Sequence, residues 1–182
     1  MARAKAGTLP RTTPSVSGEP PLYDRALAML ARRPFSTEEL RRRLAQPGTP
    51  PAGIDAVIAR LTGVGLLDDA AYATVVARSK LLGSGVSTRR LRAELARRRV
   101  DRTVADRAIQ AVVADEAIDM AAQLDAVARK KLRSLAGLDP LVRRRRAFGF
   151  LARRGYDADE IRRALESALG DEDHAESRDS ST

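Results

Sequence analysis

The sequence predicts an all-α protein built from three tandem three-helix repeats. Apolar residues recur at helical spacing in a series of short segments, and Ser, Thr or Asp precedes several of these segments as a helix cap. The chain also matches itself after a shift of 51 residues, and again after a shift of 56. No segment alternates between apolar and polar residues over a useful length, so no strand is expected.

The first repeat is expected over residues 22–66. Its first helix begins at Leu22 and is stopped by Pro34, because proline blocks helix continuation. Ser36 caps the second helix, with a Glu three residues later at the spacing of a capping box. A loop rich in proline and glycine, residues 46–53, then leads into a third short amphipathic helix.

The second repeat is expected over residues 67–114. A shift of 51 residues brings identical residues of the first two repeats together, namely Ser36 with Ser87, Thr37 with Thr88, Leu40 with Leu91, Arg41 with Arg92, Leu44 with Leu95, Ala45 with Ala96 and Ile58 with Ile109. The three helices predicted from this match and from the apolar spacing are Asp69–Leu82, Thr88–Arg99 and Arg102–Val113.

The third repeat is expected over residues 115–169. A shift of 56 residues places the Leu-Ala-Arg-Arg that begins at Leu95 on the same four residues beginning at Leu151. The helices predicted here run over residues 115–135, 140–154 and 157–169. Gly155 allows the left-handed turn that ends the second of them. Chance similarity among helices rich in Arg, Ala and Leu is the alternative explanation, and the ungapped registers argue against it.

Both ends of the chain are expected to be disordered tails. Residues 1–21 contain four prolines among Ser, Thr and Gly, and residues 170–182 are acidic and polar without apolar periodicity. Neither segment offers enough apolar surface to offset the entropy lost on ordering.

The charge of the chain predicts a polyanionic partner. Lys and Arg number 33 and Asp and Glu 24, a formal net charge of +9; the tails carry +2 and −4, which leaves +11 on residues 22–169. Such a field attracts nucleic acid or an acidic protein groove. The chain has no cysteine, no secretory signal and no apolar run long enough for a membrane span, so a cytoplasmic protein is expected.

The residues needed for catalysis are missing, so no enzyme activity, cofactor or metal site is expected. The only histidine, His174, falls in the acidic tail, where a fixed base or metal ligand is implausible. The glycines at Gly83 and Gly85 lack the pattern of a nucleotide-binding loop. Adjacent Asp68 and Asp69 are interpreted as helix caps rather than as a cation site.

Basic residues on the second helices and near the start of the third repeat are the candidate binding residues. Guanidinium groups suit phosphates because their donors match the oxygens bidentately. If the repeats stack side by side, these faces line up along one arc. The predicted contacts are Arg41, Arg42, Arg43, Arg89, Arg90, Arg92, Arg97, Arg98, Arg99, Lys130, Lys131, Arg143, Arg144, Arg145, Arg153 and Arg154. For any single arginine, a solvated helix face paired with a nearby glutamate is the competing interpretation.

Four segments together resemble the RecX family, regulators of the RecA recombinase. They are STEELRRRL from Ser36, GLLDDAAYA from Gly65, residues 78–100, and Arg-Arg-Gly-Tyr from Arg153. The resemblance spans residues 22–169, and the order and spacing of the segments carry it. One departure is at Arg99, where the family pattern usually has Gly after the second helix of the middle repeat.

The resemblance implies a curved, elongated array of three repeats that acts as a monomer. It implies binding in the helical groove of the RecA filament on single-stranded DNA, with suppression of ATP hydrolysis, coprotease activity and strand exchange. It supplies no cofactor and no catalytic residue.

Two other functions remain open from the residues alone. A three-helix unit with a basic helix is typical of helix-turn-helix proteins that read DNA sequence independently of RecA, although the second helices offer almost no Asn or Gln. A plain helical scaffold whose charge serves solubility is the other.

Overall fold

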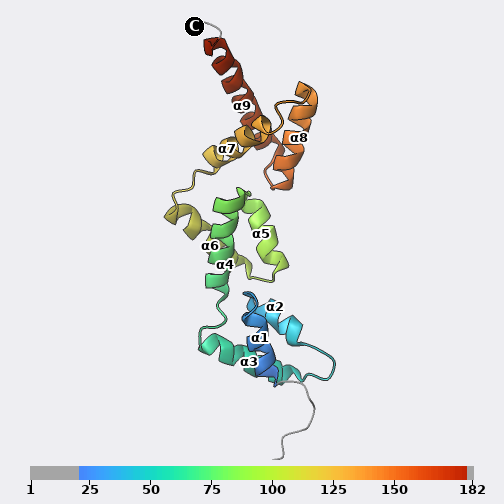
Figure 1. Ribbon diagram of the computed structural model, residues 1–182. Coiled ribbons are helices and arrows are strands. Elements are labelled where there is room, and N and C mark those ends of the chain that lie inside the picture. Colours follow the sequence, from blue (N-terminus) through green and yellow to red (C-terminus); the bar gives the residue numbers. More distant parts are fainter. Residues whose placement is uncertain (1–20, 180–182) are drawn as a thin grey trace, which may run out of the picture.

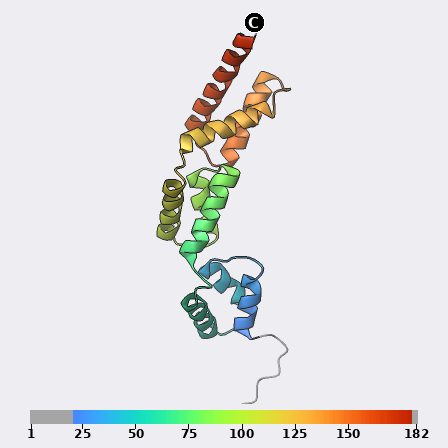
Figure 2. The same ribbon diagram turned by 60° about the vertical axis from the view of Figure 1, so that its left-hand side comes forward.

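The computed structural model describes the backbone of residues 21–179 and the side chains of residues 21–170. Within that part of the chain all regular secondary structure is helical, as the sequence predicts: nine α-helices and one π-helix. Figures 1 and 2 show three groups of helices stacked along one direction, so the molecule is elongated. Each group has its own cluster of buried side chains. The predicted tail over residues 1–21 lies, except for Pro21, outside the described residues.

The first group contains α1 (Leu22–Leu30), α2 (Thr37–Leu44) and α3 (Pro51–Gly63). The Ser36 hydroxyl accepts a hydrogen bond from the Glu39 amide at 3.2 Å, so the predicted cap of α2 is confirmed. The Glu39 carboxylate does not complete a capping box, because it binds Arg33 at 2.6 Å. Leu40, Leu44 and Leu61 fill the core of this group, and Leu67, one residue beyond the predicted boundary, packs with them.

The Arg33–Glu39 pair predicts an acid sensitivity of the first repeat. The hydrogen bond from Arg33 holds the pKa of Glu39 below its usual value, and this carboxylate is only 22% exposed. The unfolded chain therefore binds the proton more tightly, so the stabilisation is fully present above about pH 4.5 and is lost as the pH falls further. Urea unfolding from pH 7 to pH 3 is expected to show a smaller loss of stability for Glu39→Gln than for the wild type. Parallel curves would contradict the assignment.

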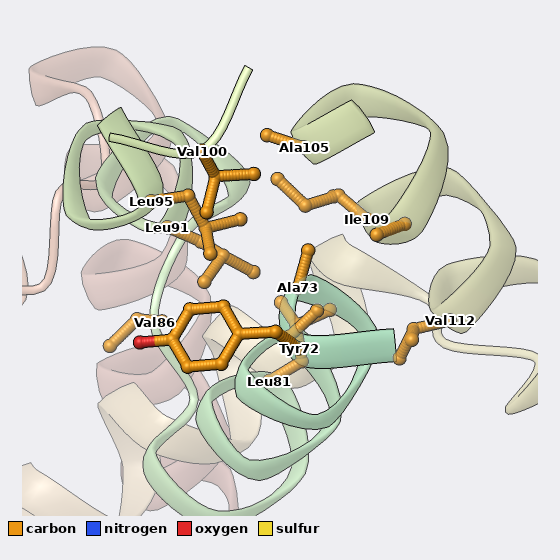
Figure 3. Close-up of a cluster of buried hydrophobic side chains, with 12 residues drawn as sticks. Tyr72, Ala73, Leu81, Val86, Leu91, Leu95, Val100, Ala105, Ile109 and Val112 are labelled. Carbon is orange, nitrogen blue, oxygen red and sulfur yellow. The ribbon is translucent and has the colours of Figure 1, made fainter. Parts of the chain in front are cut away.

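The second group contains α4 (Asp69–Arg78), η1 (Ser79–Ser84), α5 (Thr88–Arg97) and α6 (Arg102–Asp115). Asp68, Ser87 and Asp101 cap α4, α5 and α6 through side-chain oxygens that accept backbone amides. In Figure 3 apolar side chains of α5 and the residues after it face those of α4 and α6 across the core. The continuous helix predicted over residues 69–82 instead changes to a π-helix at Ser79, a widened turn that apolar spacing does not reveal.

The third group contains α7 (Met120–Arg133), α8 (Pro140–Arg153) and α9 (Ala158–Asp179). The helix expected from residue 115 starts at Met120, because α6 continues to Asp115 and Ala117 then adopts a positive φ of 47°. A solvated tail is predicted from residue 170, and the backbone of residues 170–179 continues α9. No proline follows Gly170, so nothing in the backbone chemistry stops the helix there.

The second helices of successive groups meet end to start. The Ser36 hydroxyl, at the start of α2, donates to the carbonyl of Arg98 at the end of α5. The Ser87 amide, at the start of α5, donates to the carbonyl of Arg154 at the end of α8, at 3.0 Å. The same relation therefore repeats at both junctions, and α2, α5 and α8 lie along the same side of the stack in Figure 1.

Arg99 and Gly155 occupy corresponding turns at the ends of α5 and α8. Arg99 has a φ of 61° and Gly155 a φ of 89°, both in the left-handed region. The amide of Val100 donates to the carbonyl of Leu95 at 3.1 Å, which closes α5 in the manner of a Schellman motif. The turn that glycine favours is thus formed at Arg99 in spite of the arginine side chain.

Candidate nucleic-acid interface

Two of the predicted binding residues form a repeated ion pair within their own repeats. Arg41 on α2 binds Asp55 on α3, and Arg92 on α5 binds Asp106 on α6, the second pair at 2.6 Å. Both residues of the second pair lie 51 positions after their counterparts. These arginines therefore tie the second helix of a repeat to its third helix, and their charge is partly neutralised.

Arg89 binds across the junction between the second and third repeats, whereas Arg98 binds within the second repeat. Arg89 donates to the carbonyls of Gly155 and Tyr156, at 3.1 and 3.4 Å, just beyond the end of α8. A cation at a helix C-terminus offsets the partial negative charge of the free carbonyls there. Arg98 donates to the hydroxyl of Tyr72 at 2.8 Å and lies 3.3 Å from Glu94. Both side chains therefore stabilise the free protein.

Tyr156, in the third repeat, makes a further contact across the junction between the second and third repeats. Its hydroxyl donates to the carbonyl of Gly85 at 3.1 Å, and its side chain is 4% exposed. Burial raises the pKa of this phenol. The hydroxyl therefore stays protonated and keeps its role as a donor across the physiological pH range.

Arg143 and Arg144 on α8 also bind within the protein. Arg143 donates to the carbonyl of Leu132 at 3.1 Å, and Arg144 lies 3.3 Å from Glu166 on α9. They attach α8 to the other two helices of the third repeat.

The remaining predicted residues keep their charge available. Arg43 lies 5.7 Å from the ring centroid of Phe35, a contact that does not neutralise it. The other remaining predicted residues, which have no ion pair in the described part of the chain, are Arg42, Arg90, Arg97, Arg99, Lys130, Lys131, Arg145, Arg153 and Arg154. Those of the third repeat lie close together.

Two adjoining hollows, lined mainly by residues of the third repeat, contain several of these unpaired cations. The hollow along α8, about 630 Å³, is lined by Lys131, Arg145, Arg146 and Arg153 among its charged residues. The other, about 450 Å³, lies between α7, α8 and the segment 82–85, and its charged lining residues are Lys130, Lys131 and Arg154. No carboxylate is among the residues that line either hollow. We call the two together the basic hollow.

Phe150 lies at the centre of the basic hollow. It lines both parts and is half-buried. The Lys131 ammonium lies over the Phe150 ring, 5.1 Å from its centroid, and the Arg154 guanidinium lies over it at 4.4 Å. The ring consequently lies close to two positive charges.

Sequence reasoning missed Phe150 as a residue of the basic hollow, because it assigned the aromatic residues to core and helix-end positions. Arg146 belongs to the same run of arginines on the second helix and is a candidate with them. The signal was present: Arg146, Phe150 and Arg154 stand four residues apart, which places them on one face of a helix. The sequence does not reveal that α7 packs beside that face and adds its lysines.

Within residues 21–170, no group of three or more His, Cys, Asp or Glu side chains could hold a metal ion. Nor does any described helix combine the length and the apolar character required to cross a membrane.

Fold and site together define the class: an all-α protein of three tandem three-helix repeats with a strongly basic surface hollow. Comparison with known families then gives the particular one. Models of the first, second and third three-helix domains of RecX match residues 23–61, 68–109 and 118–165 in order. The chain belongs to the RecX family, a family of regulatory proteins rather than of enzymes.

Relatives from distant bacteria agree with this assignment. The chain is 37% identical over 147 residues to the regulatory protein RecX of Xanthomonas oryzae pv. oryzae strain PXO99A, covering 81% of this chain and 87% of that one. It is 33% identical over 140 residues to the regulatory protein RecX of Pelodictyon phaeoclathratiforme, with coverages of 77% and 84%. The match extends over most of each protein.

Solved structures support the fold. The crystal structure of RecX from Lactobacillus salivarius superposes with a TM-score of 0.64 at 18% identity, covering 81% of this chain and 94% of that one. A second crystal structure of a regulatory protein RecX gives a TM-score of 0.62. The predicted all-α fold of three repeats is thus confirmed.

Proposed function

We propose that this protein regulates RecA by binding in the helical groove of the RecA filament on single-stranded DNA. The observation that carries the proposal is the end-to-start alignment of α2, α5 and α8, which gives the stack one side formed by basic helices. Residues 22–169 carry a formal charge of +11, which suits a groove whose floor is polyanionic. Membership of a regulatory family is consistent with this function.

In this proposal inhibition requires no chemistry. An elongated monomer lying along the groove contacts more than one RecA protomer and excludes a second DNA or a repressor substrate. Bridging neighbouring protomers also biases the conformational equilibrium of the filament. ATP hydrolysis, coprotease activity and strand exchange by RecA would all decrease. In this proposal the protein needs no cofactor and acts in the cytoplasm.

A titration of the full chain into RecA, single-stranded DNA and ATP tests the proposal. The rate of ATP hydrolysis is expected to fall progressively and to be largely suppressed before the protein is equimolar with RecA. Bovine serum albumin at the same concentration controls for nonspecific effects. An unchanged rate at equimolar protein would overturn the proposal.

The competing function, sequence-specific reading of duplex DNA, lacks its usual side chains. Adenine is commonly read by Asn or Gln, and neither residue occurs in α2, α5 or α8. Recovery of one enriched duplex motif from a random pool would favour that function instead.

A further inference from the structure

We infer that the basic hollow of the third repeat holds the sugar–phosphate backbone of a nucleic-acid single strand, with a base against Phe150. This inference deepens the proposed function and rests on it, because the strand concerned is the one inside the filament. It also divides the predicted binding set: the third repeat contacts DNA, whereas Arg41, Arg89, Arg92 and Arg98 maintain the array.

The charge of the hollow is the first argument. Lys130, Arg145, Arg146 and Arg153 make no ion pair with any described residue, and no acidic side chain lines the hollow. In the first two repeats Arg41, Arg92 and Arg98 are paired with carboxylates, and the unpaired Arg42, Arg90 and Arg97 do not line the hollow. Clustered cations repel one another in the free protein, and a polyanion removes that repulsion while releasing its own counterions.

The shape of the hollow is the second argument. Two concave parts, about 450 and 630 Å³, share the lining residues Lys131 and Phe150 and so adjoin each other. A depression with cations in both parts suits a flexible chain that carries charge at regular intervals. The backbone of a duplex is held rigidly on a convex cylinder and enters such a depression less readily than a single strand does.

Phe150 is the third argument, and it favours nucleic acid over an acidic peptide. Single-strand binding proteins combine a basic groove with aromatic rings on which bases stack. Phe150 is half-buried in the hollow, with the Lys131 and Arg154 cations over its ring, so a base packs against the part of the ring that remains exposed while phosphates reach the two cations. A glutamate-rich peptide has no group that requires the ring.

Fluorescence anisotropy with a labelled oligothymidylate of about 20 nucleotides, without RecA, tests the inference on the full chain. The variant Arg145→Glu with Arg146→Glu is expected to weaken binding at least about tenfold and to flatten the log–log salt dependence by about 1.4, or about 0.7 for each lost phosphate contact. Both residues are exposed, and circular dichroism checks that the fold is kept.

The matched control is Arg32→Glu with Arg107→Glu. These arginines are exposed, lie outside the predicted binding set and have no ion pair in the described part of the chain, and the change in net charge is the same. The control is expected to weaken binding no more than about threefold, by the general field alone. Equal losses in the two variants would overturn the inference, because they would mean diffuse attraction.

Phe150→Leu separates stacking from charge. It is expected to weaken binding about fivefold or more with an unchanged salt dependence, because no phosphate contact is lost. Unchanged affinity would overturn the role of the ring. Equal affinity for duplex DNA, or displacement of the oligonucleotide by polyglutamate at a similar charge concentration, would overturn the choice of ligand.

The proposal on the basic hollow and the proposed function are tested by different experiments, so one can be overturned without the other. RecA is absent from the anisotropy experiment, so loss of DNA binding in the Arg145→Glu, Arg146→Glu variant supports the hollow whatever RecA does. The ATPase titration of the wild type decides the proposed function, since it does not depend on which cations bind DNA.

Discussion

Replacing Gly155 with alanine is expected to destabilise the protein by about 2–5 kcal/mol. A residue with a side chain costs about 1–2 kcal/mol more than glycine in the left-handed region, and Gly155 has a φ of 89°. A Cβ atom there would lie 2.5 Å from the Cβ of Arg90 and 2.6 Å from the hydroxyl oxygen of Ser87, an overlap that adds about 1–3 kcal/mol. Urea unfolding of Gly155→Ala and the wild type measures the difference.

Arg99→Gly is the matched control at the corresponding turn. The substitution relieves a left-handed arginine at a φ of 61°, and the added freedom of the unfolded chain offsets part of that gain. A change within about 1 kcal/mol, towards greater stability, is expected. If Gly155→Ala also stays within 1 kcal/mol of the wild type, the close packing of the second junction is not what sets its stability.

Truncation of Leu91 is expected to destabilise the second repeat by about 2–5 kcal/mol, the range for a buried leucine replaced by alanine. Leu91 is fully buried among side chains of α4, α5 and α6 (Figure 3). Because the three core clusters are separate, hydrogen exchange in Leu91→Ala should accelerate most in residues 69–115 and much less in residues 22–63.

Leu141→Ala provides the comparison for a leucine outside the cores. Leu141 is 79% exposed at the start of α8, so its truncation is expected to change stability by less than about 0.5 kcal/mol. Uniform acceleration of exchange over all three repeats in Leu91→Ala would mean that they unfold as one unit, contrary to the expectation.

Local chemistry made most of the fold predictable. The caps at Ser36 and Asp68 use side-chain oxygens whose geometry depends on a few adjacent residues, and the structure confirms both. The helix ends were harder, because they depend on competition between similar backbone states. The π-helix at Ser79 and the continuation of α9 beyond Gly170 illustrate this difficulty.

The candidate site was predictable only in part. The 51-residue shift relates Arg41 to Arg92 and also Asp55 to Asp106, so the repeated ion pair was detectable from the sequence. The basic hollow was not, because it needs the lysines of α7 beside the aromatic face of α8. That placement comes from packing between helices and leaves no periodic trace in the chain.

The end-to-start contacts of α2, α5 and α8 have a mechanical consequence. Each contact uses a main-chain carbonyl as its acceptor, at Arg98 and at Arg154. Substitution of the Arg98 or Arg154 side chain therefore leaves the acceptor in place. The three core clusters are separate, so polar main-chain and side-chain contacts make up much of the two seams between them. A change in the angle between two repeats would therefore alter these few contacts and leave each core intact.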